Sequence, residues 1–341
     1  MTVKIIKQFR KKPKRLPFRN HLECYWESIY RGYRVQQYHS KGPQVKNYLD
    51  ASFVMIKYLQ NMHNHIFGFR IDLHIPEDIS CPFDDTDNVL IRRFLYWLQL
   101  ELNRSRSKHS TRVHAIWARE KLDRTWVDRK RKRGDKILDP DAAKPHYHVL
   151  ILLNGDSFNR VGSYKPTQKA NGDKAYGEKA NGEKANGEKA NGEYLSDTLA
   201  HRVIRAWSYA LGKLPHCHMH GLVEFCKQVH FKDLPATKEE PAKKSPKKKV
   251  ATFSIRRSEG PRGLVEIMYA VSYLCKAYSK DLSKGVRCFQ TTQVPKNAAQ
   301  KVWDDERDRG PSVAQYGTPR ALTKWSENEA LEENEDNDFD W

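Results

Sequence analysis

The amino-acid sequence predicts an α+β fold, in which strands and helices alternate along the chain, and three stretches carry this prediction. Residues Ile66 to Ile75 alternate between apolar and polar side chains, which is typical of a strand with one buried face. Residues Pro145 to Asn154 include a continuous apolar run, which favours a central strand covered on both sides. Residues Asn88 to Asn103 show the apolar spacing of an amphipathic helix.

The remaining elements are predicted in the same way from local patterns. Apolar residues at strand-like positions indicate three shorter strands, at residues 114–120, 221–225 and 286–290. Helical periodicity indicates two more helices, at residues 194–211 and 263–280. From these elements we expect a central antiparallel sheet of about five strands, with helices packed mainly on one face.

Composition points to a basic protein with a polyanionic partner. The chain of 341 residues has 61 Lys and Arg residues against 42 Asp and Glu residues, a formal net charge of +19. This excess favours nucleic acid as the partner, and eight tryptophans and sixteen tyrosines offer stacking surfaces for bases. The six cysteines show no C-x-x-C spacing, which favours reduced thiols in a cytoplasmic setting. No apolar run is long enough to span a membrane, so we expect no membrane partner.

The sequence divides into one folded domain with appendages. We predict a basic and aromatic N-terminal arm at residues 1–61, the domain at 62–292, and a C-terminal extension with an acidic tail at 293–341. Two interpretations of the arm remain open. In the first, the arm binds nucleic acid; in the second, it is a solvated tail followed by a helix that packs on the domain.

Two stretches inside the domain are predicted to be disordered insertions, at residues 156–193 and 232–260. The first contains five consecutive five-residue units, of which Lys179 to Glu183 is one, and the second is rich in Lys, Pro and Ala. Such compositions cannot bury a core, and we assign the repeats no chemistry.

The predicted strand at residues 146–154 opens with two histidines. Alternate side chains of a strand share a face, so His146 and His148 point the same way and can chelate a divalent metal. The alternative is the start of a strand with two ordinary hydrogen-bonded histidines.

The predicted helix at residues 263–280 places Tyr269 and Tyr273 on one face with Lys276 and Lys280. A tyrosine titrates near a pKa of about 10 and is a poor nucleophile at neutral pH. A nearby lysine and a metal-polarised phosphate would make attack by its phenolate feasible. The alternative is an amphipathic helix with an exposed polar face.

Together, these elements and motifs resemble the HUH endonucleases of rolling-circle replication. Within that class the chain is most similar to the inovirus-type replication-initiator proteins of filamentous phages and integrated elements. The resemblance spans residues 62–292, and the tyrosine follows the histidines in sequence as in replication initiators. The matching stretches are Arg70 to Pro76, Trp117 to Glu120, His146 to Asn154 and Ser272 to Lys276.

The resemblance implies a metal-dependent endonuclease that nicks and joins single-stranded DNA at a replication origin. Mg²⁺ or Mn²⁺ would sit on His146 and His148, with Glu120 as third ligand because an oxygen donor suits these ions. Tyr273 would attack the scissile phosphate, giving a 5′-phosphotyrosine link and a free 3′-hydroxyl. Lys276 would stabilise charge at the phosphate or lower the pKa of the tyrosine.

The resemblance leaves the roles of several further residues open. Tyr269 is a second nucleophile for strand transfer or a neighbour that stacks on a base. We also expect DNA contacts from four residues that accompany the motifs: Arg70, Asp72, His74 and Lys280.

Two other functions compete with this interpretation. One is a non-catalytic DNA-binding replication regulator that keeps the same fold. The other is a metal-dependent hydrolase without a covalent step, which would add one of three loop histidines, His216, His218 or His220, to the metal ligands. The hydrolase predicts no covalent adduct with DNA.

The acidic tail suggests a further partner. Residues 327–341 contain eight acidic residues and no basic ones, so they can compete with DNA for the basic surface. The aromatic residues Phe339 and Trp341 make the ending similar to the tips of bacterial single-stranded-DNA-binding proteins, which dock replication partners. The tail is therefore either a docking site for host replication proteins or a solubilising segment.

Overall fold

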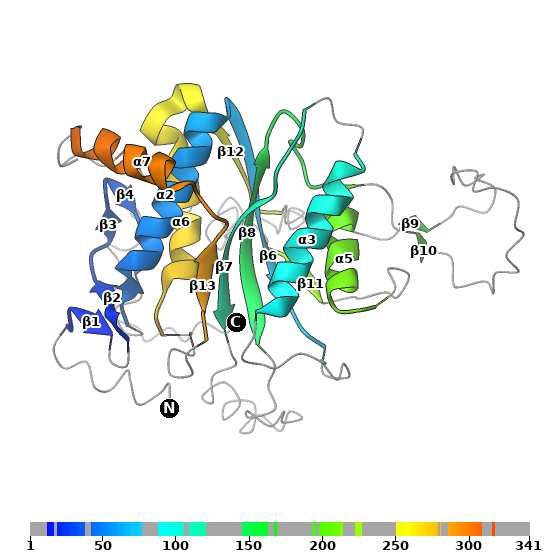
Figure 1. Cartoon of the computed structure of the whole chain (residues 1–341), viewed down its shortest axis with the longest axis horizontal. Coiled ribbons are helices and arrows are strands. Elements are labelled where there is room, and N and C mark those ends of the chain that lie inside the picture. The colour runs from blue at the N-terminus through cyan, green and yellow to red at the C-terminus, as the bar shows by residue number, and fades with distance from the viewer. Residues whose placement is uncertain are drawn as a thin grey trace, which may run out of the picture.

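The sheet and its helices are seen in a computed structural model (Figure 1). The loop histidines, the acidic tail and nearly all of the repeats lie outside the described residues. The structure describes residues 12–16, 19–37, 42–76, 88–105, 109–120, 145–162, 167–168, 193–194, 198–213, 222–226, 250–278, 280, 286–308 and 316–317.

Within the described residues, six strands form the main sheet, in the order β11-β6-β8-β7-β13, with β12 also paired to β6. All the pairings are antiparallel, which confirms the predicted α+β class and the antiparallel sheet. The strand with the two histidines, β8, lies at the centre, as its apolar character on both faces predicted. The strands are β6 (His65–Leu73), β7 (His114–Glu120), β8 (His146–Asn154), β11 (Val223–Phe225), β12 (Thr252–Arg256) and β13 (Phe289–Thr291).

Strand β12 corrects the prediction that residues 232–260 are wholly disordered. Its alternation places Phe253 and Ile255 in the core, where they are 7% and 2% exposed, and its backbone pairs with His65 to Phe69 of β6. The Lys- and Pro-rich residues before it hid this short pattern. The first insertion also begins later than predicted, because Val161 is buried and its carbonyl accepts a hydrogen bond from the backbone N–H of Ala200.

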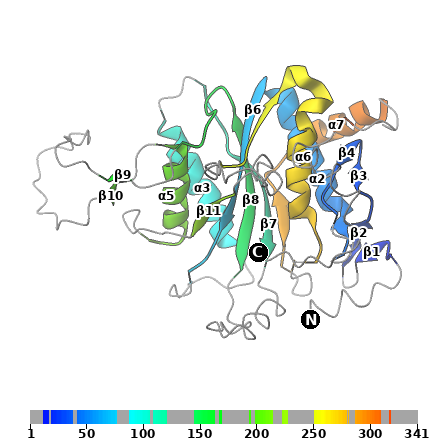
Figure 2. The same cartoon turned by 180° about the vertical axis from the view of Figure 1, so that it is seen from behind.

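Helices cover both faces of the sheet, so the prediction of helices mainly on one face is wrong. Helices α3 (Val89–Asn103) and α5 (Leu199–Ala210) pack on the face that carries Phe69 and Ile151. Helices α2 (Lys46–Met62) and α6 (Val265–Ser272) pack on the opposite face (Figures 1 and 2). A central strand that is apolar on both sides needs a layer on each side to exclude water.

The N-terminal residues join the same core, so the predicted boundary between arm and domain at residue 61 does not hold. Leu49, Phe53 and Ile56 of α2 are fully buried against the sheet. For the described part of the arm, the helix packed on the domain is therefore the better interpretation. The short strands β1 (Arg15–Leu16), β2 (Arg19–Tyr25) and β5 (Gln44–Val45) form a second sheet, and β3 (Ile29–Tyr30) pairs with β4 (Tyr33–Arg34).

The predicted C-terminal extension also begins inside the domain. Helix α7 (Lys296–Asp308) packs on α2, where Trp303 stacks on Phe53 with ring centroids 6.0 Å apart. The guanidinium of Arg31 lies 4.5 Å from the ring centroid of Trp303. Strands β9 (Thr167–Gln168) and β10 (Glu193–Tyr194) pair with each other on either side of the repeats.

The helix predicted at residues 263–280 is broken into pieces. A 3-10 helix, η2 (Arg257–Leu264), leads into α6, and a single 3-10 turn, η3 (Tyr273–Cys275), follows it. The chain becomes extended at Lys276, which forms a β-bridge with Gln44. A tertiary backbone contact thus replaces the last helical turns. Among the described residues, no helix has the length and apolar character needed to cross a membrane.

Candidate metal centre

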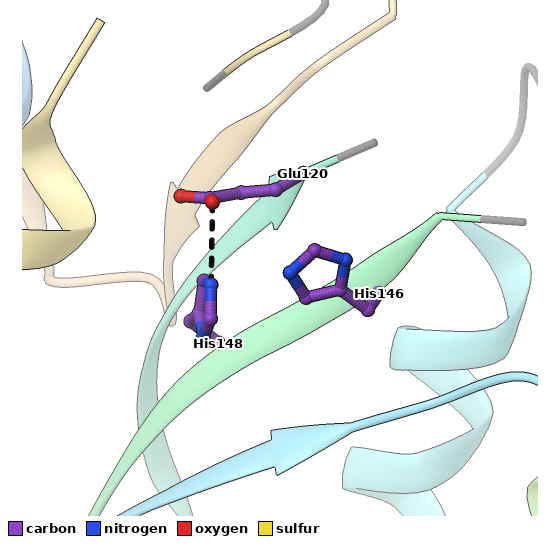
Figure 3. A group of neighbouring side chains, drawn as sticks. All are labelled: Glu120, His146 and His148. Carbon is purple, nitrogen blue, oxygen red and sulfur yellow. Dashed lines mark ion pairs between the residues drawn. The ribbon is translucent and has the colours of Figure 1, made fainter. Parts of the chain in front are cut away.

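Three predicted metal ligands come together at one end of the central strands. Glu120, the last residue of β7, lies directly opposite His146, the first residue of β8, in the antiparallel register. His148 is two residues further along β8 and therefore points to the same face. One ligand atom from each of the three residues lies within 4.8 Å of the others (Figure 3). The two histidines of β8 and Glu120 thus form a group with the residue types and spacing of a candidate metal site.

Glu120 is the electrostatic centre of this group. Its Oε1 lies 3.4 Å from Nζ of Lys280, and its Oε2 lies 3.3 Å from both Nζ of Lys276 and Nε2 of His148. Burial would raise the pKa of Glu120, but Lys280, His148 and Lys276 together hold it well below its usual range. Glu120 is therefore a carboxylate, the form that binds a cation.

His148 lies between two carboxylates. Asp72 is its direct partner across β6 and β8, and Asp72 Oδ1 lies 2.7 Å from His148 Nδ1. Burial would lower the pKa of His148, but Asp72 and Glu120 raise it above its usual value. Groups that stabilise a proton on a buried imidazole would equally stabilise a divalent cation there. A carboxylate at Nδ1 also sets the ring so that Nε2 faces the ligand group, as is usual for metal-bound histidine.

His146 differs electrostatically from His148. Burial, with a contribution from the neighbouring His148, lowers the pKa of His146 to about 4. The ring is therefore neutral near pH 7, which a metal ligand requires. The ring of His74 stacks on it at a centroid separation of 5.7 Å. Two imidazole nitrogens and one carboxylate oxygen make a donor set that fits a divalent cation.

Tyr273, the predicted nucleophile, lies beside this group. Its ring centroid is 5.3 Å from that of His148, and the two rings are nearly perpendicular. Nζ of Lys276 lies 3.5 Å from the centroid of the tyrosine ring, and the guanidinium of Arg70 lies 4.4 Å from it. Burial lowers the pKa of Lys276 to about 8, although Glu120 opposes this shift. A tyrosine, a lysine and three ligand side chains from distant parts of the sequence therefore share one site.

The second tyrosine occupies a different position. Tyr269 lies one turn before Tyr273 on α6 and is half-buried. Its carbonyl accepts hydrogen bonds from Nε2 of Gln36, at 3.2 Å, and from Oγ of Ser272, at 2.6 Å. These contacts tie Tyr269 to the N-terminal segment, and the role of second nucleophile stays a prediction.

The four residues predicted to bind DNA surround the metal ligands. Arg70 and Asp72 alternate along β6, and His74 follows the end of the strand. Arg70 contacts the ring of Tyr273, Asp72 contacts His148, and His74 stacks on His146. Arg70 also lies 3.5 Å from Asp72. Lys280 is 2% exposed, and its ammonium group already forms an ion pair with Glu120 inside the protein. Their contact with DNA stays a prediction. Pattern analysis missed the contact of Asp72 with His148, although the alternation of β6 already placed Asp72 on the polar face.

Comparisons with known proteins place part of the chain without describing an activity. A family model described as the YagK/YfjJ C-terminal domain matches residues 28–174. The uncharacterized protein YagK of Escherichia coli (strain K12) is 23% identical over 144 residues, which cover 38% of this chain and 61% of that relative. The chain therefore spans less than two thirds of that relative's length. No solved structure matches.

The matched family segment contains Glu120, His146 and His148 but ends before Tyr273 and Lys276. It starts at residue 28, well before the predicted domain boundary, in keeping with the packing of α2 in the core. Neither description names an activity, so the resemblance to HUH replication initiators stays a prediction.

Proposed function

We propose that this protein is a rolling-circle replication initiator, a metal-dependent endonuclease that nicks and joins single-stranded DNA. The observation that supports this best is the position of Tyr273, whose ring contacts His148 of the ligand group and lies under Nζ of Lys276. A structural tyrosine needs no such neighbours, whereas a phenolic nucleophile needs a cationic environment. The net charge of +19 suits a nucleic-acid substrate.

The reaction would be a transesterification at phosphorus. Glu120, His146 and His148 would hold Mg²⁺ or Mn²⁺, which polarises the scissile phosphate when bound. The phenolic oxygen of Tyr273 forms a bond to phosphorus, and the bond from phosphorus to the 3′-oxygen breaks. Joining is the reverse step, in which a 3′-hydroxyl attacks the phosphotyrosine.

We assign the proton transfer in this reaction to Lys276, whose Nζ lies 3.5 Å from the centroid of the Tyr273 ring. With a pKa of about 8, its Nζ exists in both protonation states near neutral pH. As an amine it accepts the phenolic proton of Tyr273, and as an ammonium it returns a proton to the departing 3′-oxygen. Asp72 holds His148 in place while this occurs.

The alternative is a DNA-binding replication regulator that keeps the fold without catalysis. The presence of Tyr273 and Lys276 beside three ligand side chains favours the enzyme. The hydrolase alternative depends on His216, His218 or His220, which lie outside the described residues.

The deciding experiment incubates the protein with single-stranded DNA and Mn²⁺ and then detects a covalent protein–DNA adduct on a denaturing gel. Tyr273→Phe should abolish the adduct, while Tyr269→Phe, a matched control one helical turn away, should retain it. Replacing both His146 and His148 by Ala should abolish cleavage yet leave most DNA affinity, because Lys and Arg contacts to phosphate dominate binding. An adduct in Tyr273→Phe, or undiminished cleavage without the histidines, would contradict the proposal.

A further inference from the structure

The N-terminal sheet contains a pocket that the proposed chemistry does not use. The pocket has a volume of about 370 Å³ and lies where β1 meets β2. Its lining includes three exposed cationic side chains, from Lys12, Lys14 and Arg15, and the half-buried ring of Trp26. The indole Nε1 donates a hydrogen bond to the carbonyl of Pro13 at 3.0 Å, which holds the ring in the wall of the pocket.

Among the described residues of this lining, the one acidic group, that of Glu23, is already paired. Glu23 lies opposite Arg15 in the register of β1 and β2. Its Oε2 lies 3.2 Å from Nζ of Lys46, at the start of α2. The pocket therefore keeps a net positive charge, and residues Lys4, Lys7, Arg10 and Lys11 precede it in the sequence.

Backbone contacts connect this sheet to the metal centre. Gln44 of β5 bridges to Lys276, and the N–H of Ala277 donates to the carbonyl of Pro43 at 3.0 Å. Ala277 also packs in an apolar cluster with Leu16, Leu22 and Val45. Strand β2 is two strand spacings from Lys276, about 10 Å. In both views, β1 and β2 lie at the same end of the molecule as the tips of β7 and β8 (Figures 1 and 2).

We propose that this pocket binds single-stranded DNA next to the scissile phosphate, an inference that rests on the proposed function. A cationic groove that follows the phosphates, with an aromatic ring on which a base stacks, is the general arrangement for binding single strands. Lys12, Lys14 and Arg15 contact phosphates, and Trp26 stacks on a base. The bound DNA strand then continues past Lys276 to Tyr273.

The test measures binding of the full chain to a fluorescent single-stranded oligonucleotide by anisotropy, in EDTA and over a range of salt concentrations. The variant replaces Lys12, Lys14 and Arg15 by Gln. Each lost phosphate contact should reduce the slope of log affinity against log salt by about 0.7, or about 2 for all three. At 0.1 M salt this corresponds to a loss of roughly 100-fold, about 5-fold for each contact.

A matched control replaces by Gln three exposed cations on β12, η2 and α7 that do not line the pocket: Arg256, Arg262 and Lys301. This control removes the same charge and should retain most of the slope and affinity. A second measurement uses an oligonucleotide with 5-iododeoxyuridine, ultraviolet cross-linking and peptide mapping, which should identify the peptide that contains Trp26.

Each outcome bears on one proposal or on both. An unchanged salt slope in the pocket variant, or equal losses in the pocket variant and the control, overturns the pocket even if the wild type forms the covalent adduct. Loss of slope in the pocket variant alone supports the pocket, and if the wild type then forms no adduct with Mn²⁺, only the nicking function fails. A wild-type chain that does not bind single-stranded DNA overturns both.

Discussion

Replacing Asp72 tests whether a carboxylate behind His148 orients this histidine as a metal ligand. Asp72→Asn keeps the size of the side chain and a neutral oxygen acceptor, whereas Asp72→Ala removes the acceptor altogether. The contact at stake is 2.7 Å long, between Oδ1 of Asp72 and Nδ1 of His148. Because His148 is 5% exposed, water cannot easily replace the lost partner.

The size of the effect follows from this geometry. Loss of a partner behind a metal-bound histidine costs about 10- to 100-fold in metal affinity, or roughly 1.4 to 2.8 kcal/mol. A hydrogen bond to a neutral acceptor is about half as strong as one to a carboxylate. We therefore expect Asp72→Asn to weaken Mn²⁺ binding about 10-fold and Asp72→Ala about 100-fold.

The measurement is a titration of Mn²⁺ into the full chain by isothermal calorimetry, near pH 8, where protons compete less for imidazole than they do at neutral pH. Asp50→Asn is the matched control, because Asp50 pairs with Lys46 on α2, outside the ligand group. Equal Mn²⁺ affinities in the wild type and both Asp72 variants would refute the reasoning, since His148 would then bind metal without this partner or not at all. A loss shared by Asp50→Asn would indicate a general effect on the fold.

Three further predictions concern stability. Glu120→Gln should destabilise the fold in EDTA by roughly 3–5 kcal/mol, because Lys276 and Lys280 lose their buried carboxylate partner. Urea unfolding measures this loss of stability. Adding Lys280→Met to the variant should recover part of it, because one unpaired buried cation is then removed. His114 is buried, and burial with repulsion from Arg112 and His63 lowers its pKa to about 4, so the unfolded chain takes up a proton first and stability falls as the pH drops from about 6.5 to about 4. Between pH 7 and pH 4, the free energy of unfolding of His114→Phe should therefore fall by about 3 kcal/mol less than that of the wild type. If the free energies of unfolding of the two proteins change in parallel with pH, the assignment is refuted. Deleting residues 169–193 should leave the melting temperature and adduct formation nearly unchanged, because loop closure entropy varies slowly with length; a large loss of either would give the repeats a function.

The local spacing of apolar residues was sufficient to predict the helices and strands in which this spacing is unbroken. The alternation of β6 and the apolar run of β8 predicted both strands to within one or two residues, and the apolar run also predicted the central position of β8. The same alternation placed His146 and His148 on one face. The prediction failed for β12, because the Lys-rich residues before it hid its short alternation. It also failed for the helix predicted to reach residue 280, which ends at Ser272, because a backbone contact with Gln44 replaces its last turns.

The sequence by itself determined which side chains share a face of one element, because the periods of strand and helix are properties of the local backbone. It therefore placed the two histidines on one face of β8, whereas the single helical face predicted for Tyr273 and Lys276 does not form, because α6 ends at Ser272. Only the tertiary structure decided which faces meet. The register of β6 against β8 sets Asp72 opposite His148, and the bridge from Gln44 to Lys276 ends the helix and carries a basic pocket to the same end of the sheet. Such contacts join residues far apart in sequence, and packing and hydrogen bonding across the whole domain select them, which no local period encodes.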